Sequence, residues 1–150
     1  MSLPVLYVDD SPDDVFFVDR AFRSVAPGVE LRIIPDGQAA ADYFDPIAQP
    51  DPPPESLALA LLDLNLPGRS GLEVLIQIRK NSRTPALPVV IFSASNQRKD
   101  IDACYAEGCN AYLIKPCDPD GLRQLVTLVA NIWLKDPQPN RPPTILPGPA

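Results

Sequence analysis

The chain has 150 residues, 45% hydrophobic and 21% charged, a balance typical of one soluble globular domain with a real core. Its net charge of −6 argues against direct binding to nucleic acid or to an anionic membrane, so proteins are the expected partners. No basic leader and no stretch of about 20 apolar residues is found, so we expect neither a signal peptide nor a membrane anchor. Three cysteines without C-x-x-C spacing and the absence of histidine argue against a zinc site and fit a reduced, cytoplasmic setting.

The first part of the chain predicts two units of a strand followed by a helix. An apolar strand over 3–8 ends in Asp9 and Asp10, and Ser11 then caps a helix that Pro12 opens. A second strand is expected over 31–34 and a short helix over 38–44. The next segment, 45–56, holds five prolines and is predicted to be an exposed, stiff connector without a regular element.

The second part continues the alternation of strands and helices. Uninterrupted Leu and Ala over 57–63 predict a strand that is buried on both faces and ends in Asp63. The remaining expected elements are a helix over 70–81 with Leu72, Leu75, Ile76 and Arg79 on one face, strands over 89–92 and 111–114, a helix over 97–107, and a last helix opening at Asp118 or Pro119. Five such alternations predict a parallel sheet with right-handed crossovers.

The chain is expected to divide into a folded domain over 1–134 and a flexible tail over 135–150. The tail has six prolines in sixteen residues and is too short for a second folded domain. We therefore expect no attached output domain.

Reactive side chains follow four of the predicted strands. They are Asp9 with Asp10, Asp63, Ser93 and Lys115. Each has an ordinary structural explanation when taken alone: a helix-capping acidic pair, a turn former, a serine at the edge of the core, or a salt bridge. The carboxyl ends of parallel strands lie along one edge of a sheet, where ligands bind, so the joint placement favours a functional site.

Three carboxylates at close range predict a divalent cation, because like charges raise one another's pKa unless a cation compensates them. Mg²⁺ prefers oxygen ligands, so Asp10 and Asp63 are its expected direct ligands, with Asp9 acting through water. The backbone carbonyl of Asn65 could complete the shell. Two charges from the metal and one from Lys115 would balance the three carboxylates.

A carboxylate beside Mg²⁺ and a lysine is arranged to attack phosphorus. Asp63 is the expected nucleophile. Ser93 can donate to one phosphoryl oxygen and Lys115 can pair with another, while the metal holds the third.

Four motifs together resemble the receiver domain of two-component response regulators. They are V-D-D at 8–10, L-L-D-L-N-L-P-G at 61–68 followed by S-G, F-S-A at 92–94, and Y-L-I-K-P at 112–116. The resemblance implies a flavodoxin-like (CheY-like) α/β fold, with five parallel strands in the order 2-1-3-4-5 and five helices. It also implies Mg²⁺ dependence and phosphorylation of Asp63 by the phosphohistidine of a partner kinase. The core around Asp63, the proline-bearing loop and the closing N-I-W-L-K-D-P-Q-P are similar to small stand-alone regulators paired with bacterial phytochromes.

The resemblance also implies a switch, in which Ser93 shifts toward the phosphoryl group and Tyr112 turns inward behind it. Tyr112 could equally be a half-buried strand aromatic without such a role. Self-association is a further hypothesis, because Leu128 and Ile132 lie off the core-facing stripe of the last helix. The alternative is a broad buried stripe with scattered exposed apolar residues.

Three other classes compete with this interpretation. A flavin-binding flavodoxin is rejected, because Asp9 and Asp10 would repel the flavin phosphate. A dehalogenase-type phosphatase is a weak rival, since it expects D-x-D after the first strand. The more serious alternative is a receiver-fold docking or dimerisation module that acts largely independently of phosphorylation. For the favoured interpretation we expect a phospho-acceptor signalling protein rather than an enzyme, one that catalyses at most its own phosphotransfer and dephosphorylation.

Overall fold

The computed structural model describes residues 3–48, 53–134 and 144–149. In these residues the chain forms a five-stranded parallel sheet in the order β2-β1-β3-β4-β5, which confirms the predicted topology. The strands are β1 (Val5–Val8), β2 (Leu31–Ile34), β3 (Leu59–Leu62), β4 (Val89–Ser93) and β5 (Ala111–Ile114). None of the helices in the described ranges is long and apolar enough to cross a lipid bilayer.

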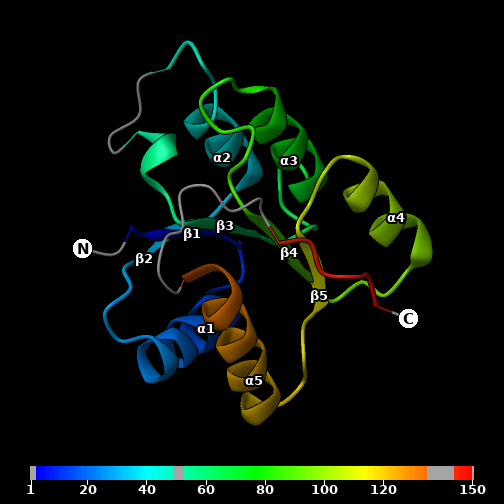
Figure 1. Ribbon diagram of the computed structural model, residues 1–150. Coiled ribbons are helices and arrows are strands. Elements are labelled where there is room, and N and C mark those ends of the chain that lie inside the picture. The colour runs from blue at the N-terminus through cyan, green and yellow to red at the C-terminus, as the bar shows by residue number, and fades with distance from the viewer. Residues whose placement is uncertain (1–2, 49–52, 135–143, 150) are drawn as a thin grey trace.

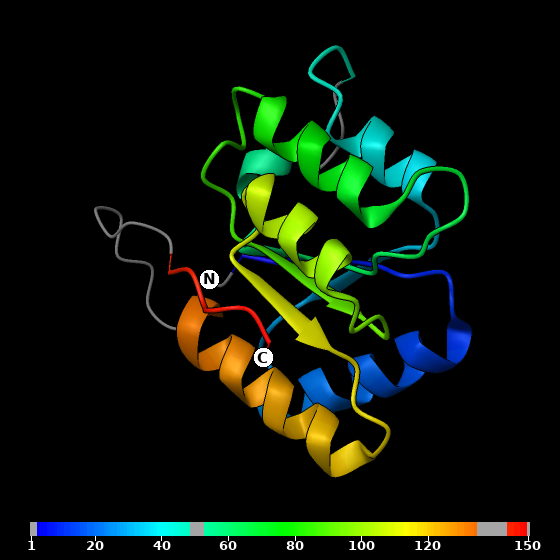
Figure 2. The ribbon, with the colours of Figure 1, turned by 90° about the vertical axis from the view of Figure 1, so that its right-hand side faces the viewer.

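Helices cover both faces of the sheet, so the molecule has three layers (Figures 1 and 2). One face carries α1 (Pro12–Val25) and α5 (Pro119–Val129), and the other carries α2 (Gly37–Tyr43), α3 (Gly71–Lys80) and α4 (Arg98–Ala106). The five helices agree with the predicted fold. Two short turns add to them, the 3₁₀ turn η1 (Pro54–Ser56) and the π-helical turn η2 (Ala130–Leu134).

The helix boundaries follow from local side-chain chemistry. Four helices begin at a side chain that accepts a hydrogen bond from a backbone N–H of the first turn, which satisfies a donor that the helix itself leaves free. These capping residues are Ser11, Asp36, Ser70 and Asp118. Gly108 follows α4 with a φ of +95°, a conformation that a residue with a Cβ rarely adopts.

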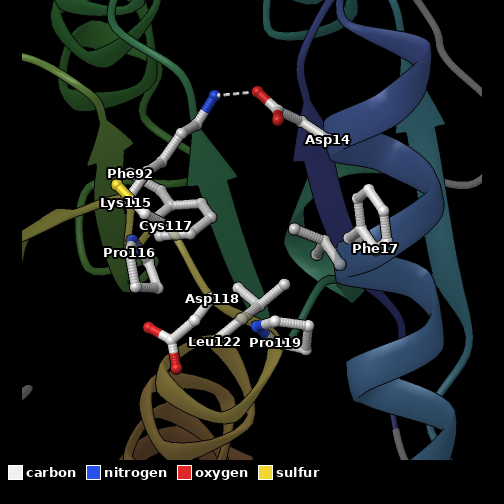
Figure 3. A pocket seen from close by; sticks show the side chains of 10 residues that line it. Asp14, Phe17, Phe92, Lys115, Pro116, Cys117, Asp118, Pro119 and Leu122 are labelled. Atoms are coloured by element: carbon white, nitrogen blue, oxygen red, sulfur yellow. Dashed lines mark hydrogen bonds and ion pairs between the residues drawn. The ribbon is translucent and has the colours of Figure 1, made fainter.

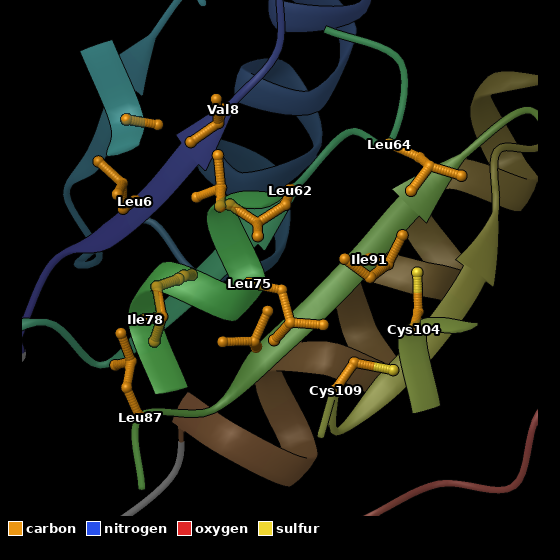
Figure 4. Packing of buried hydrophobic residues seen from close by; sticks show 14 of the residues in the cluster. Leu6, Val8, Leu62, Leu64, Leu75, Ile78, Leu87, Ile91, Cys104 and Cys109 are labelled. Carbon is orange, nitrogen blue, oxygen red and sulfur yellow. The ribbon is translucent and has the colours of Figure 1, made fainter. Parts of the chain in front are cut away.

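The central strands are buried on both faces, as expected for parallel strands between helical layers. Every residue of β1, β3 and β4 is buried. The core is therefore split by the sheet into two clusters, one under α1 and α5 and one under α2, α3 and α4. Figure 4 shows the second cluster, to which Leu62, Leu75, Ile91 and the buried Cys104 belong.

Two local predictions need correction, and the last helix, for which only the start was predicted, changes type near its end. The buried face of α3 is formed by Val74, Leu75 and Ile78. Arg79, which was expected on that face, instead donates hydrogen bonds to the carbonyls of Leu87 and Gly108. The connector was expected to lack a regular element, but its end forms η1 with Pro54 buried. Residues 49–52 of that connector lie outside the described residues. The last helix changes from α5 to η2 at residue 130.

The predicted boundary at residue 134 stays a prediction, because 135–143 lie outside the described residues. Residues 144–149 are described, and they lie beside β5 and α4 as an extended segment (Figures 1 and 2). Nothing in the sequence analysis anticipated this contact.

Candidate functional site at the carboxyl edge of the sheet

The topology brings the predicted residues to one edge of the sheet. Asp9 and Asp63 directly follow the neighbouring strands β1 and β3, and the Asp63 N–H donates to the carbonyl of Val8 at 2.9 Å. Ser93 ends β4 and Lys115 follows β5, with the Lys115 N–H donating to the Ser93 carbonyl at 2.8 Å. Four strand ends are thus tied together in pairs by their backbone.

Lys115 is the centre of the ionic contacts. Its ammonium nitrogen lies 3.0 Å from Asp9 Oδ2, 3.0 Å from Asp63 Oδ2 and 2.7 Å from Asp14 Oδ2. Burial acts to lower the pKa of Lys115, but the hydrogen bond with Asp14 and the charges of Asp63 and Asp9 outweigh it and raise that pKa. Lys115 is therefore held as a cation among three carboxylates.

Asp9 is the most firmly fixed of these carboxylates. It is 1% exposed, and its side chain accepts hydrogen bonds from the Tyr7 hydroxyl and from the Ser11 N–H. Burial, followed by the bond to Asp9, raises the pKa of Tyr7, so the phenol stays protonated and remains a donor. Such contacts leave Asp9 little freedom to reorient.

Asp63 is also buried, with 7% of its surface exposed. Its Oδ1 accepts from the Asn65 N–H at 3.2 Å, and its Oδ2 accepts from Lys115. Burial raises the pKa of Asp63 and the charge of Asp9 adds to this effect, while Lys115 opposes it. The net rise in pKa means that this site disfavours the ionised form of Asp63 relative to the protonated form.

A set of oxygen atoms here could hold a metal ion. One carboxylate oxygen from each of Asp9, Asp10 and Asp63 lies within 4.8 Å of the others, and Asp10 is exposed to solvent. An all-oxygen donor set with a net negative charge suits a hard divalent cation. The role of the Asn65 carbonyl as a further ligand remains a prediction.

Ser93 and Tyr112 lie behind this cluster. Ser93 is fully buried, and its hydroxyl oxygen accepts from the Ser95 N–H at 3.2 Å. Tyr112 is 1% exposed and its hydroxyl donates to the Ser95 carbonyl at 2.9 Å. The ring is therefore fully buried rather than half-buried, and its part in a switch stays a prediction.

Sequence reasoning did not place Asp14 among the candidate site residues. It lies in the first turn of α1, immediately after the loop that carries Asp9 and Asp10, and makes the shortest of the three contacts with Lys115. That position on the first helical turn beside the strand edge is the signal that could have found it.

A cavity of about 320 Å³ opens beside Lys115 and was also not predicted. It lies between α1 and the start of α5, and Figure 3 shows Phe17, Pro119 and Leu122 around it, with Lys115 and Asp14 at one end. Its walls are largely apolar, and it ends at the ionic cluster.

Comparison with known proteins identifies the family. Residues 5–127 match the response regulator receiver domain. The chain is 34% identical to the probable methanogenesis regulatory protein FilR2 of Methanothrix harundinacea, over 87% of this chain and 83% of that protein. It is 33% identical to response regulator Rcp1 of Synechocystis, over 87% of this chain and 88% of that protein.

Solved structures agree with this assignment. The Mn²⁺-bound form of response regulator Rcp1 superposes with a TM-score of 0.79 at 32% identity, covering 91% of this chain and 97% of that one. The phosphorylated cyanobacterial phytochrome response regulator RcpA gives 0.78 at 28% identity, covering 92% and 98%. The chain belongs to the family of response regulator receiver domains.

Proposed function

We propose that this receiver accepts a phosphoryl group on Asp63 from the phosphohistidine of a partner kinase, in a Mg²⁺-dependent reaction, and signals through altered protein contacts. The observation that carries the proposal is the placement of Asp63. Its carboxylate lies at the carboxyl edge of the sheet, 3.0 Å from Lys115 and within 4.8 Å of oxygens from Asp9 and Asp10.

The chemistry required of the chain is a nucleophilic displacement at phosphorus. An oxygen of Asp63 forms the new P–O bond while the P–N bond to the donor imidazole breaks, and the imidazole leaves with the electron pair. Lys115 lies beside the nucleophile and can pair with a phosphoryl oxygen as charge moves onto the transferred group. The hydroxyl of Ser93, at the neighbouring strand end, is the donor for another oxygen.

Asp10, Asp63 and the Asn65 carbonyl are the proposed ligands of the metal, with Asp9 acting through water. A bound divalent cation would neutralise charge on the carboxylates and on the phosphoryl oxygens. The oxygen donor set and the Mn²⁺-bound form of Rcp1 support a divalent site, and Mg²⁺ is the ion that we propose.

Ser93 and Tyr112 are the proposed switch residues. A phosphoryl group adds a charge of about −1.5 to −2 and strong acceptor oxygens, which give the Ser93 hydroxyl a new partner. The aromatic ring of Tyr112 lies behind the same loop, joined to it through the Ser95 carbonyl. A change at Ser93 can therefore be transmitted to β5.

A phytochrome-type histidine kinase in the cytoplasm is the proposed phosphodonor. Support comes from similarity to the cyanobacterial phytochrome response regulator RcpA and to the bacteriophytochrome response regulator AtBRR, at 28% and 26% identity. The apolar cavity beside Lys115, with Phe17 44% exposed at its wall, offers a surface on which the donor protein could pack.

A docking or dimerisation module is the second candidate, favoured by exposed apolar side chains on the α1 and α5 face. Phe16 is 60% exposed and Leu128 is 38% exposed. Ile132 is only partly exposed, so Leu128 is the better candidate for a homodimer contact on the last helix. Sedimentation at high concentration, with and without phosphorylation, tests self-association; a monomer under both conditions would remove it.

Intact-mass analysis after incubation with a small phosphodonor tests the proposed function. We expect one phosphoryl adduct that requires both Mg²⁺ and Asp63, so that chelation of the metal and Asp63→Asn each abolish it. Transfer from a phytochrome-type kinase should be faster than from an unrelated histidine kinase. Absence of an adduct on the folded wild type would favour the docking module.

A further inference from the structure

Residues 144–149 form a specific contact with the edge of the domain. The Leu146 N–H donates to the Asn110 carbonyl at 2.8 Å, and the Asn110 side-chain amide donates to the Thr144 carbonyl at 3.0 Å. The Tyr105 hydroxyl donates to the Leu146 carbonyl at 2.7 Å, and Arg98 donates to the Pro149 carbonyl at 2.8 Å. Figure 1 shows this red segment passing beside β5 and α4.

The segment lies at the start of the edge strand β5 and against α4. β5 is an edge strand, and an edge strand presents unpaired backbone groups that can bind another chain. Leu146 is partly buried against the core cluster under α5, and a Cβ added to Gly148 would lie 3.1 Å from the Tyr105 ring. Pro147 and Pro149 keep the segment extended, so docking costs little conformational entropy.

A chain of hydrogen bonds leads from the segment to the phosphorylation site. The Tyr105 hydroxyl donates to Leu146 and also accepts from the Tyr112 N–H at 3.1 Å. The Tyr112 hydroxyl donates to the Ser95 carbonyl, and the Ser95 N–H donates to the Ser93 hydroxyl oxygen. One continuous network thus joins Leu146 to Ser93.

The direction of the coupling follows from the bond to Ser93. A hydroxyl can accept and donate at the same time, so Ser93 can keep the hydrogen bond from the Ser95 N–H while it donates its proton to a phosphoryl oxygen. Ser93 lies at the same strand edge as Asp63: β3 and β4 pair Leu62 with Ile91, and Asp63 and Ser93 follow that pair by one and two residues. Docking of the segment therefore favours an arrangement in which Ser93 can donate to a phosphoryl oxygen.

We propose that residues 144–149 are a built-in ligand of the α4–β5 edge, whose docking favours the arrangement of Tyr112 and Ser93 that receives the phosphoryl group. The proposal rests on the proposed function, because it assigns regulation to the same site. Linkage is reciprocal, so phosphorylation strengthens docking by the factor by which docking favours phosphorylation. While docked, the segment also occupies the backbone carbonyl of Asn110, directly before β5.

The test uses the full chain, with beryllium fluoride and Mg²⁺ as the probe of the site. Amide exchange at Leu146 reports docking, and titration of the probe reports affinity. Leu146→Asp removes the partly buried anchor, and Ile145→Asp is its matched control, because Ile145 is 67% exposed. Tyr105→Phe keeps the ring and removes the hydroxyl that joins Leu146 to Tyr112.

We expect the Leu146 amide to be protected in the wild type, and the probe to raise that protection about five-fold or more. Leu146→Asp should lose the protection and bind the probe more weakly by a similar factor, while Ile145→Asp should change neither. Tyr105→Phe should lower the effect of the probe on Leu146, because the network is cut.

An unprotected Leu146 amide in the wild type, or equal probe affinity in the two Asp variants, would overturn the proposal. Protection that depends on protein concentration would assign the segment to a second copy and overturn docking within one chain. If the wild type binds the probe but Leu146 does not respond, the coupling fails and the proposed function stands. If the wild type does not bind the probe at all, the coupling and the proposed function both fail. Protection of the Leu146 amide would then still report whether the segment docks.

Discussion

Asp63→Asn should stabilise the fold at pH 7 in the presence of a chelator. At an effective dielectric constant of about 20, a like charge within 4.8 Å repels Asp63 by about 3.5 kcal/mol or more, and Lys115 at 3.0 Å attracts it by about 5.5 kcal/mol. Two carboxylates repel it, and solvent screens the one on exposed Asp10. The Lys115 attraction therefore offsets most of the repulsion, and burial of the ionised carboxylate, the largest cause of its raised pKa, leaves the charge destabilising. Removing the charge is expected to raise the free energy of unfolding by about 1 kcal/mol.

Urea denaturation as a function of pH measures this gain. The pKa of Asp63 is raised above the ordinary value of 3.8, so its charge destabilises the fold above the folded-state pKa. The advantage of Asp63→Asn should therefore be full at pH 7 and shrink as the pH falls through that pKa. Asp13→Asn, at an exposed position on α1, is the charge-matched control and should show no such advantage.

Two results would refute this reasoning. Asp63→Asn could be less stable than the wild type at pH 7 without metal, or its advantage could grow on acidification. Either would mean that the Lys115 contact outweighs the repulsion and the burial of Asp63. Addition of Mg²⁺ should instead stabilise the wild type more than the variant, because the variant has lost a ligand.

Three further substitutions test the cluster. Lys115→Met should lower the free energy of unfolding by about 3 kcal/mol without metal, since it leaves buried carboxylates unpaired, and a divalent cation should recover part of the loss in thermal denaturation. Asp14→Asn should raise beryllium fluoride affinity about three-fold more than Asp13→Asn, because one competitor for the ammonium is removed; equal effects would mean that only net charge matters. Gly71→Ala should cost about 1–3 kcal/mol in urea denaturation, because its Cβ would lie 2.2 Å from the Asp63 carbonyl oxygen; an unchanged midpoint would show that the backbone yields there.

The sheet and the central carboxylates could be predicted because parallel topology leaves few alternatives. Once five strands alternate with helices, their carboxyl ends must share one edge, so Asp9, Asp63 and Lys115 meet whatever the details of the loops. Buried apolar strands and capping residues such as Ser11 also act locally, within a few residues of sequence. These patterns can be recognised in the sequence without any knowledge of side-chain packing.

The contacts that were missed depend on positions in space rather than on local pattern. Asp14 contacts Lys115 across 101 residues of sequence. Whether the Asp14 carboxylate faces solvent or the Lys115 ammonium depends on the direction in which α1 leaves the loop. The contact of Leu146 with Tyr105 spans 41 residues and joins a proline-rich segment to a helix surface. The proline-rich composition predicts a flexible tail there, because composition alone carries no information about which surface of the domain the segment contacts.

Chemical trapping of the phosphorylated residue tests the central claim most directly. Borohydride reduces an acyl phosphate to an alcohol, so peptide mass mapping after treatment with a phosphodonor and Mg²⁺ should find homoserine at position 63 and at no other aspartate. The same mapping on Asp63→Asn, or after chelation of the metal, should find none. A modified Asp9 or Asp10, or a borohydride-resistant phosphoryl group on Ser93, would contradict the assignment of Asp63 as the acceptor.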